Sequence, residues 1–290
     1  MSAVLENALW SALFAGVVAT AVTVAIERFG GRVGGLLGTL PTTIVPASVG
    51  IWLQTEGDAA FQAAMDATPA GMLVDALFLW AWRALPPRLP QMPLKTTLAL
   101  MTALTLGLWL LIAWPTVLIG NAFPIGETLP FGLVSMALLV GVGIAGTLSS
   151  TPTPRGHRRV SWATLALRGV FAATAIGVAV WIADVAGPVA AGIAAVFPAI
   201  FFTSMASLWL AQGHAVPAGA VGPMMLGASS VGAYALFAHA LFPAIGPVAG
   251  AVVSWVAAVA TTTLPAWLWL ERRANRASGS KRSRTGYRMG

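Results

Sequence analysis

The sequence predicts an all-α, polytopic membrane protein with about nine transmembrane helices, arranged as two inverted four-helix repeats joined by one linking helix. Two features predict the membrane class and a third predicts the repeats. Only 9% of the residues are charged, whereas soluble domains carry about a quarter. No Asp, Glu, Lys or Arg occurs from Val185 to Leu270. Charges are costly at depth in lipid, so stretches of this kind are typical of membrane proteins.

The third feature is an internal similarity at a spacing of 157 residues, between Glu27–Gly57 and Asp184–His214. The two segments align without a gap, and both begin with an acid. The alignment pairs Gly30 with Gly187, Gly35 with Gly192, Pro41 with Pro198, Trp52 with Trp209 and Leu53 with Leu210. Repeats of opposite orientation are typical of secondary transporters, so this pattern also bears on function.

Apolar runs bounded by charge, Gly or Pro give the expected spans, because a helix needs roughly 20 apolar residues to cross the hydrocarbon core. In chain order the runs are Leu5–Ile26, Val33–Gln54, Ala67–Trp82, Leu94–Trp114, Leu129–Leu148, Val160–Ala183, Pro188–Ala211, Val216–Phe242 and Ile245–Leu270. The first run carries Glu6 and lacks a basic leader, so we interpret it as a retained helix and not as a cleaved signal.

All 16 cations fall on one side of the membrane if the N-terminus lies outside and the C-terminus lies in the cytoplasm. They are Arg28 and Arg32, then Arg83, Arg88 and Lys95, then Arg155, Arg158, Arg159 and Arg168, and seven in the tail. This distribution fixes the expected orientation under the positive-inside rule. The acids Glu6, Glu56, Asp58, Asp66, Glu127 and Asp184 are expected on the outer side.

The spans divide the chain into four parts. Residues 1–128 form the first repeat, 129–159 the linking fifth span with a basic cytoplasmic loop, 160–270 the second repeat, and 271–290 a disordered basic cytoplasmic tail. Spans one to four pair with spans six to nine. Partners lie five spans apart, an odd number, so each runs opposite to its mate.

Two spans contain prolines that should break the helix at membrane depth, around Thr39 to Pro46 and around Pro198. Matching breaks in two repeats indicate a substrate site between spans two and seven. The alternative is packing, with the hydroxyls bonded inside their own helices. The candidate substrate-binding residues are Thr39, Pro41, Thr42, Thr43, Pro46, Ser48, Pro198, Thr203 and Ser204.

Asp75 is the one acid expected well inside a span, and its repeat mate is Gly232. A carboxyl retained at this depth usually faces the interior, protonated or paired, so Asp75 is the candidate coupling residue for a proton or cation. The alternative is structural, with Asp75 reaching Arg83 or a hydroxyl. His239 could relay protons, although a lone histidine is more often a packing residue.

Four charged residues are candidate gates, because Glu27 and Asp184 end spans one and six on opposite sides, near Arg28 and Arg32. The competing interpretation is that these helix-end charges are simply solvated. The many Trp residues near span ends are interpreted as interfacial belts.

Several function classes are excluded or disfavoured. The chain has no Cys, and it contains no phosphate-binding loop, metal-ligand spacing or hydrolase motif. We therefore expect no enzyme, no cofactor, no metal site and no use of ATP. The basic tail is expected to interact with anionic lipid and not with nucleic acid.

The segment from Gly34 to Glu56, followed by the Met65–Trp82 helix, resembles the GlpM-like family of small bacterial inner-membrane proteins, which have a glycine-led second helix with Leu/Phe-Pro-Thr. Gly35, Leu40, Pro41 and Thr42 match this pattern. Gly192, Phe197 and Pro198 match it again, with Ala199 at the Thr position. The chain thus resembles two fused units. The resemblance implies a multi-pass protein of the bacterial inner (plasma) membrane and an association with exopolysaccharide production. A looser architectural similarity is to the drug/metabolite transporter superfamily.

Two functions remain as hypotheses. The first is a secondary transporter that moves a small, not highly charged solute by alternating access, with proton coupling through Asp75. The second is a non-transporting membrane component of an envelope or exopolysaccharide assembly system. The expected partners are the lipid bilayer, the solute and a proton, and an oligomer is compatible with either function.

Overall fold

The computed structural model describes residues 40–55, 57–149, 162–212 and 215–273, with a few positions between 6 and 17. All elements of this part are helical, as expected. Five helical stretches are long and apolar enough to cross a membrane: Leu94–Gly120, Leu129–Leu148, Pro188–Ala206, Ala218–Ile245 and Pro247–Arg273. They correspond to the expected spans four, five, seven, eight and nine, so the chain has the helices of a membrane protein.

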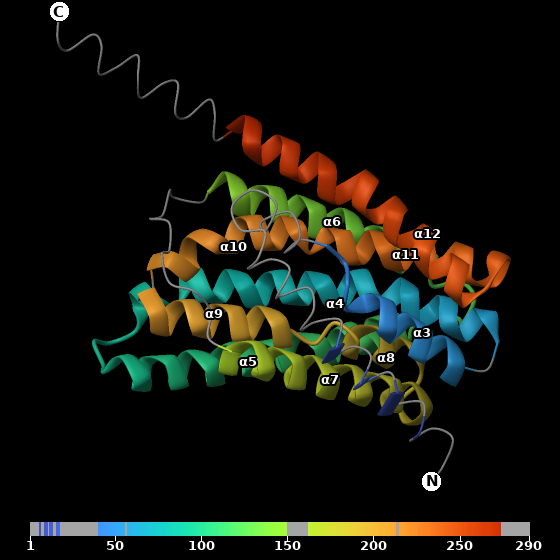
Figure 1. Cartoon of the computed structure of the whole chain (residues 1–290), viewed down its shortest axis with the longest axis horizontal. Coiled ribbons are helices and arrows are strands. Elements are labelled where there is room, and N and C mark those ends of the chain that lie inside the picture. The colour runs from blue at the N-terminus through green and yellow to red at the C-terminus, as the bar shows by residue number, and fades with distance from the viewer. Residues whose placement is uncertain are drawn as a thin grey trace, which may run out of the picture.

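The helices form a bundle around α4, which covers Asp58–Ala84 (Figure 1). Its principal neighbours are α6 (Leu129–Leu148), α8 (Pro188–Ala194) and α11 (Ser229–Ile245). Most of α4 is buried, including Phe61, Phe78 and Trp82. This position explains how Asp66 and Asp75 are accommodated in α4, because protein and not lipid surrounds them.

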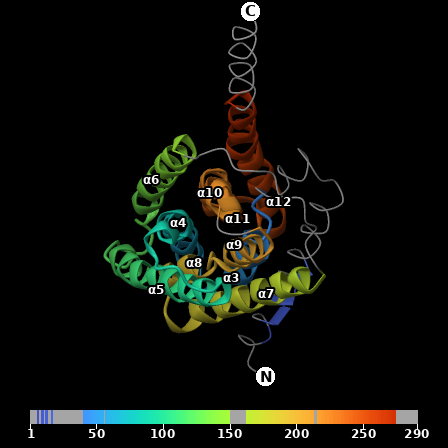
Figure 2. The same cartoon turned by 90° about the vertical axis from the view of Figure 1, so that its left-hand side faces the viewer.

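Apolar side chains cover the outside of the bundle. In the end-on view of Figure 2, α5 (Leu94–Gly120), α6, α7 (Trp162–Val185) and α12 (Pro247–Ala258) lie around α10 (Ala215–Gly227) and α11. Leu111 on α5 is 73% exposed and Val248 on α12 is 76% exposed. Outward-facing apolar side chains of this kind suit contact with lipid tails.

Prolines and glycines mark where the helices begin. The pairs Gly187-Pro188 and Gly246-Pro247 start α8 and α12, and each glycine has a φ near the left-handed region, at 85° and 80°. Glycine adopts this φ without steric cost, and proline is well suited to the first helical position. At both places the Gly-Pro pair makes a sharp turn, and a new helix follows directly.

Several expected spans are divided or longer in the structure. The seventh span is two helices, α8 and α9 (Ala199–Gln212), and the eighth is α10 and α11 with a break at Ala228. The fourth continues past Trp114 to Gly120, because Pro115 is accommodated inside α5. The last helix contains a π turn, η2 (Val259–Thr263).

The third span was placed too late in the chain. It was expected to begin at Ala67, but α4 begins at Asp58, nine residues earlier. Asp66, which precedes the expected start of the span, therefore lies two turns inside α4 and is 0% exposed. Two acids, Asp66 and Asp75, are buried in the central helix.

The two expected proline breaks have the same local turn. The amide of Thr42 donates to the carbonyl of Leu40 at 2.9 Å, and the amide of Ala199 donates to the carbonyl of Phe197 at 2.7 Å. Each hydrogen bond closes a three-residue turn with a proline at its centre. Helices α3 (Ile44–Gln54) and α9 follow these turns.

Candidate functional site

Asp75 lies in the second half of α4 and is 1% exposed. The indole Nε1 of Trp109, on α5, donates a hydrogen bond of 2.7 Å to its Oδ1. Within the described residues, no cation lies within ion-pair distance of this carboxyl. Asp75 is therefore a buried carboxyl held by a neutral donor.

Trp109 connects Asp75 to the break between α8 and α9. Its ring meets the ring of Phe197 edge-on, with centroids 5.2 Å apart and planes at 77°. Phe197 is the residue before Pro198, and Pro198 stands at the centre of the turn that precedes α9. We call Asp75, Trp109 and Phe197 the Asp75 site.

Glycines let α4 pack closely against α8, the helix that precedes the break at Pro198. A Cβ on Gly71, one turn before Asp75, would lie 3.1 Å from the Cα of Ile193. A Cβ on Gly192 would overlap the carbonyl oxygen of Ala64. The proline break predicted at Pro198 and the acid predicted at Asp75 are thus brought into one region of the bundle.

Arg83 does not pair with Asp75, although the sequence left that pairing open. Its Nη1 donates to the carbonyl of Gly146 at 2.8 Å and its Nη2 to the hydroxyl of Ser149 at 3.2 Å. Both acceptors belong to the C-terminal end of α6, where exposed carbonyls favour a cation. Arg83 therefore connects α4 to the end of α6.

A second buried acid, Asp66, was missed in the sequence. Its Oδ2 accepts a hydrogen bond of 2.6 Å from the hydroxyl of Thr128, and its Oδ1 lies 2.9 Å from Nδ1 of His239. Among the described residues, neither Oδ1 nor Nδ1 has another hydrogen-bond partner. The Nε2 of Gln62 donates to the backbone carbonyl of His239 at 3.3 Å.

This group, called the Asp66 cluster (Asp66, Thr128 and His239), joins three elements: α4, α11 and the start of α6. His239 is thus not the isolated histidine that the sequence suggested. Asp66 and Asp75 are nine residues apart, which on a helix is two and a half turns and roughly 13 Å, on opposite faces. The two carboxyls consequently serve different interfaces of α4.

Ser48 is the candidate substrate residue with the clearest structural partner. It is 0% exposed, its hydroxyl donates to the carbonyl of Val45 at 2.9 Å, and its Oγ lies 2.7 Å from the hydroxyl of Tyr234. Because the single Ser48 proton serves Val45, the Tyr234 hydroxyl donates to Ser48. The contact joins α3 to α11.

The remaining described candidates surround the two turns. Pro41 and Pro198 are buried, whereas Thr42 and Thr43 are half-buried. Pro46 lies in the first turn of α3, where its missing N–H costs nothing. Thr203 donates to the carbonyl of Ala199 at 2.9 Å, as the packing interpretation requires, and Ser204 is buried beside it.

The predicted walls of the substrate site share a neighbour. Helix α3 packs chiefly against α7, α12 and α11, and α9 packs chiefly against α7, α10 and α5. Thus α7 contacts both walls, and so does α4, whose Trp82 ring meets the rings of Phe202 and Trp209 on α9. Thr39, Glu27, Arg28 and Arg32 lie outside the described residues, and Asp184 lies near the end of α7 with its side chain outside the described part.

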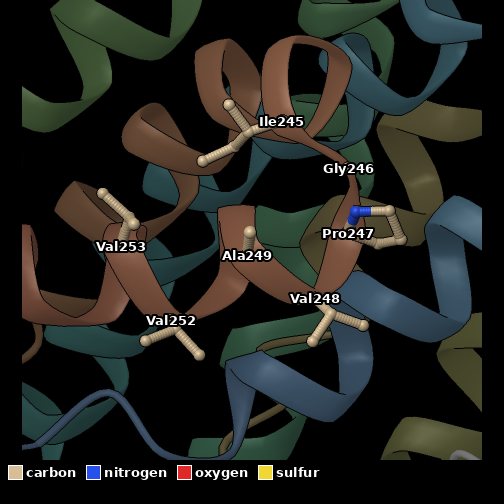
Figure 3. Close-up of a pocket in the computed structure, with 7 residues that line it drawn as sticks. All are labelled: Ile245, Gly246, Pro247, Val248, Ala249, Val252 and Val253. Atoms are coloured by element: carbon tan, nitrogen blue, oxygen red, sulfur yellow. The ribbon is translucent and has the colours of Figure 1, made fainter.

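Two cavities lie elsewhere, and no candidate site residue lines either of them. The larger, about 560 Å³, is a surface groove over the turn from α11 to α12, where Gly246 and Pro247 make the bend (Figure 3). Its side chains are all apolar, so nothing there would orient a polar ligand. The smaller, about 190 Å³, lies between the α10–α11 break and η2.

The described residues contain no group of three or more His, Asp or Glu that could hold a metal ion. Comparisons with protein families, with curated proteins and with solved structures gave no match. The functional assignment therefore rests on the chain's own residues and their geometry.

Proposed function

We propose that the protein is a secondary carrier that moves a small, weakly polar solute across the bacterial inner membrane by alternating access. Asp75 is its coupling group and takes up a proton during the cycle. The N-terminus lies outside and the C-terminus in the cytoplasm. The helix breaks at Pro41 and Pro198 flank the substrate path.

The Asp75 site is the observation that carries the proposal. It connects a buried carboxyl on the central helix, through Trp109, to the residue before a broken helix of the other repeat. An ionisable residue buried inside a bundle marks an ion or proton path in many membrane proteins. A proton arriving at Asp75 would change its bond with Trp109 and, through it, the packing of the break.

The geometry at the 157-residue spacing supports two repeats. The turns centred on Pro41 and Pro198 have the same hydrogen bond. Helices α3 and α9, which follow these turns, begin within two residues of this spacing, at Ile44 and Ala199.

Helix direction supports an inverted relation between the repeats. The ring of Phe61 stacks on that of Phe242 with centroids 4.7 Å apart, and Pro69 approaches Gly232 further along α4. Residue numbers therefore rise along α4 as they fall along α11, so the two helices are antiparallel. Helix α6, which packs on both, is the linking span between the repeats. Inverted repeats with interrupted helices are typical of secondary carriers.

Solid-supported-membrane electrophysiology on proteoliposomes tests the proposal. Under a proton gradient, a panel of neutral metabolites and lipophilic drugs is applied to the wild type and to Asp75→Asn. The expected result is a substrate-dependent current in the wild type that falls to background in Asp75→Asn. Asp58→Asn, at the exposed start of the same helix, should keep the current.

Other outcomes would contradict the proposal. An equal current in Asp75→Asn would remove Asp75 from the coupling step. No current and no change in a pH-sensitive dye, with folded wild type, would instead favour the assembly component suggested by the GlpM-like resemblance. A partner protein that co-purifies would be the next observation expected in that case.

A further inference from the structure

A small cavity of about 190 Å³ lies where two irregular segments of the second half meet. One wall is the break at Ala228, with Leu226 and Ser229 beside it, and the other is the π turn η2. Neither segment belongs to the Asp75 site. π turns inside helices occur frequently at functional sites.

The π turn frees one buried hydroxyl. Thr261 and Thr262 donate to the carbonyls four residues earlier, at 2.7 Å and 2.6 Å. The equivalent acceptor for Thr263 would be the carbonyl of Val259, but in the π turn this carbonyl accepts the amide of Leu264, five residues on. Thr263 is 2% exposed and lines the cavity, and its hydroxyl has no hydrogen-bond partner within the part of the chain that the structure describes.

An unpaired hydroxyl in a buried position is costly, so buried polar atoms without partners call for an explanation. A ligand with a hydrogen-bonding group would provide the missing partner. The ring of Trp267 and the methyl of Ala266 line the same cavity and would contact the apolar part of such a ligand.

The first half indicates how this site differs from its counterpart. Thr105-Leu106 and Trp109 on α5 recur as Thr263-Leu264 and Trp267, at a spacing of 158. This spacing is one residue longer than the 157 of the rest of the repeat. A one-residue insertion that the helix accommodates by a π turn would produce the difference. In α5 the threonine bonds to its own helix at 2.7 Å and the tryptophan bonds to Asp75. The residue that corresponds to Asp75 at the spacing of 157 is Gly232, which has no side chain that could accept a hydrogen bond from Trp267.

We propose that this cavity binds a small, neutral, mostly apolar molecule with one hydroxyl or amide group, which hydrogen-bonds to the Thr263 hydroxyl. A cavity of about 150 Å³ accepts benzene, so the present volume suits a single ring with a short polar substituent. The described lining residues include no charged side chain, which excludes ionic ligands. Binding here does not require transport, so the inference stands beyond the proposed function.

Fluorine NMR with 4-fluorophenol as the probe tests the site, using the full chain in lipid nanodiscs and empty nanodiscs as the baseline for partitioning. We expect saturable binding to the wild type. Thr263→Val, which keeps the shape and removes the hydroxyl, should weaken binding by about two- to tenfold, the effect of one hydrogen bond. Ala266→Leu should abolish saturable binding because it fills the cavity.

Thr261→Val is the matched control, since its hydroxyl is exposed and already bonded to Ala257; its affinity should equal that of the wild type. Undiminished affinity in Thr263→Val would overturn the proposal, as would absence of saturable binding to the wild type. If Ala266→Leu does not fold, the near-isosteric Thr263→Val decides the question alone. Because the readout is binding, the result is independent of whether the protein carries a solute.

Discussion

At the scale of single residues, the decisive feature is the pairing of Asp75 with Trp109. The carboxyl is buried and its Oδ1 accepts a hydrogen bond of 2.7 Å from the indole. Loss of a donor to a buried acceptor costs roughly 1–3 kcal/mol, because water does not replace it. The bond therefore matters both for folding and for the state of the carboxyl.

Trp109→Phe should lower the free energy of unfolding by about 1–3 kcal/mol, because the ring remains while the N–H donor is lost. Equilibrium unfolding with SDS in mixed micelles would measure the change. Trp114→Phe on the same helix is the control, since Trp114 is 70% exposed and should change little. If Trp109→Phe lowers the free energy of unfolding by the same amount in an Asp75→Leu background, the pairing is contradicted.

Sequence reasoning found Asp75 but missed Asp66, for a physical reason. Asp75 stands in the middle of an apolar run, whereas Asp66 stands at the polar start of one and was assigned to the outer side. The helix in fact continues back to Asp58 because Gly57, with a φ of 88°, begins it there. Trp109 could have been noticed as a tryptophan in mid-span, far from the interfacial belt.

At the scale of elements, close helix approach depends on glycine. Helices α4 and α8 meet where Gly192 lies against the backbone of Ala64, and the Thr68 hydroxyl lies 3.4 Å from the carbonyl of Gly192. This close approach holds α8, the part of the broken helix that precedes Pro198, against α4. Small residues at helix contacts are the usual means of such approach in membranes.

Gly192→Ala should destabilise the protein by about 1–3 kcal/mol, the usual cost of overpacking, because the added methyl overlaps the Ala64 carbonyl. Thermal unfolding in detergent, followed by circular dichroism, would report it. Gly141→Ala on α6 is the control, since no atom lies within 4 Å of its Cβ position; this change should be neutral or stabilising. Equal stability of the two variants would contradict the close approach.

Proline predicted two helix breaks. The structure has one at Pro198, between α8 and α9, and at Pro41 it has a turn that precedes α3, while the chain before Leu40 lies outside the described residues. The break at Ala228 and the π turn at Val259–Thr263 were not expected, because neither has a proline at its centre. The three successive threonines of the π turn gave no sequence signal, since threonine also occurs in ordinary membrane helices. Tertiary packing between α10–α11 and the last helix is not readable from local composition.

At the scale of the whole molecule, the helical membrane class followed directly from composition, and five helical stretches of the described residues are suitable for crossing a bilayer. The count of nine spans and the inverted repeat stay predictions. Parts of spans one, two and six lie outside the described residues, and α4 has more charge than hydropathy alone accepts in a span. Burial among other helices, which composition does not reveal, accommodates these charges.

Alternating access between inverted halves is the central claim, and paired spin labels test it most directly. The chain has no Cys, so labels can be attached to introduced cysteines without removing native ones. The pair Leu53 and Ile245 reports one end of the bundle, and the pair Arg88 and Leu210 reports the other. The 157-residue spacing exchanges the pairs, since Leu53 corresponds to Leu210 and Arg88 to Ile245. All four side chains are exposed.

The measurement is the distance distribution of each pair by double electron–electron resonance in nanodiscs, for the wild type and for Asp75→Asn across a pH range. The account predicts that one distance lengthens as the other shortens in the wild type, and that Asp75→Asn holds both at one end of this change. Two distances that stay fixed, or that change in the same direction, would contradict alternating access.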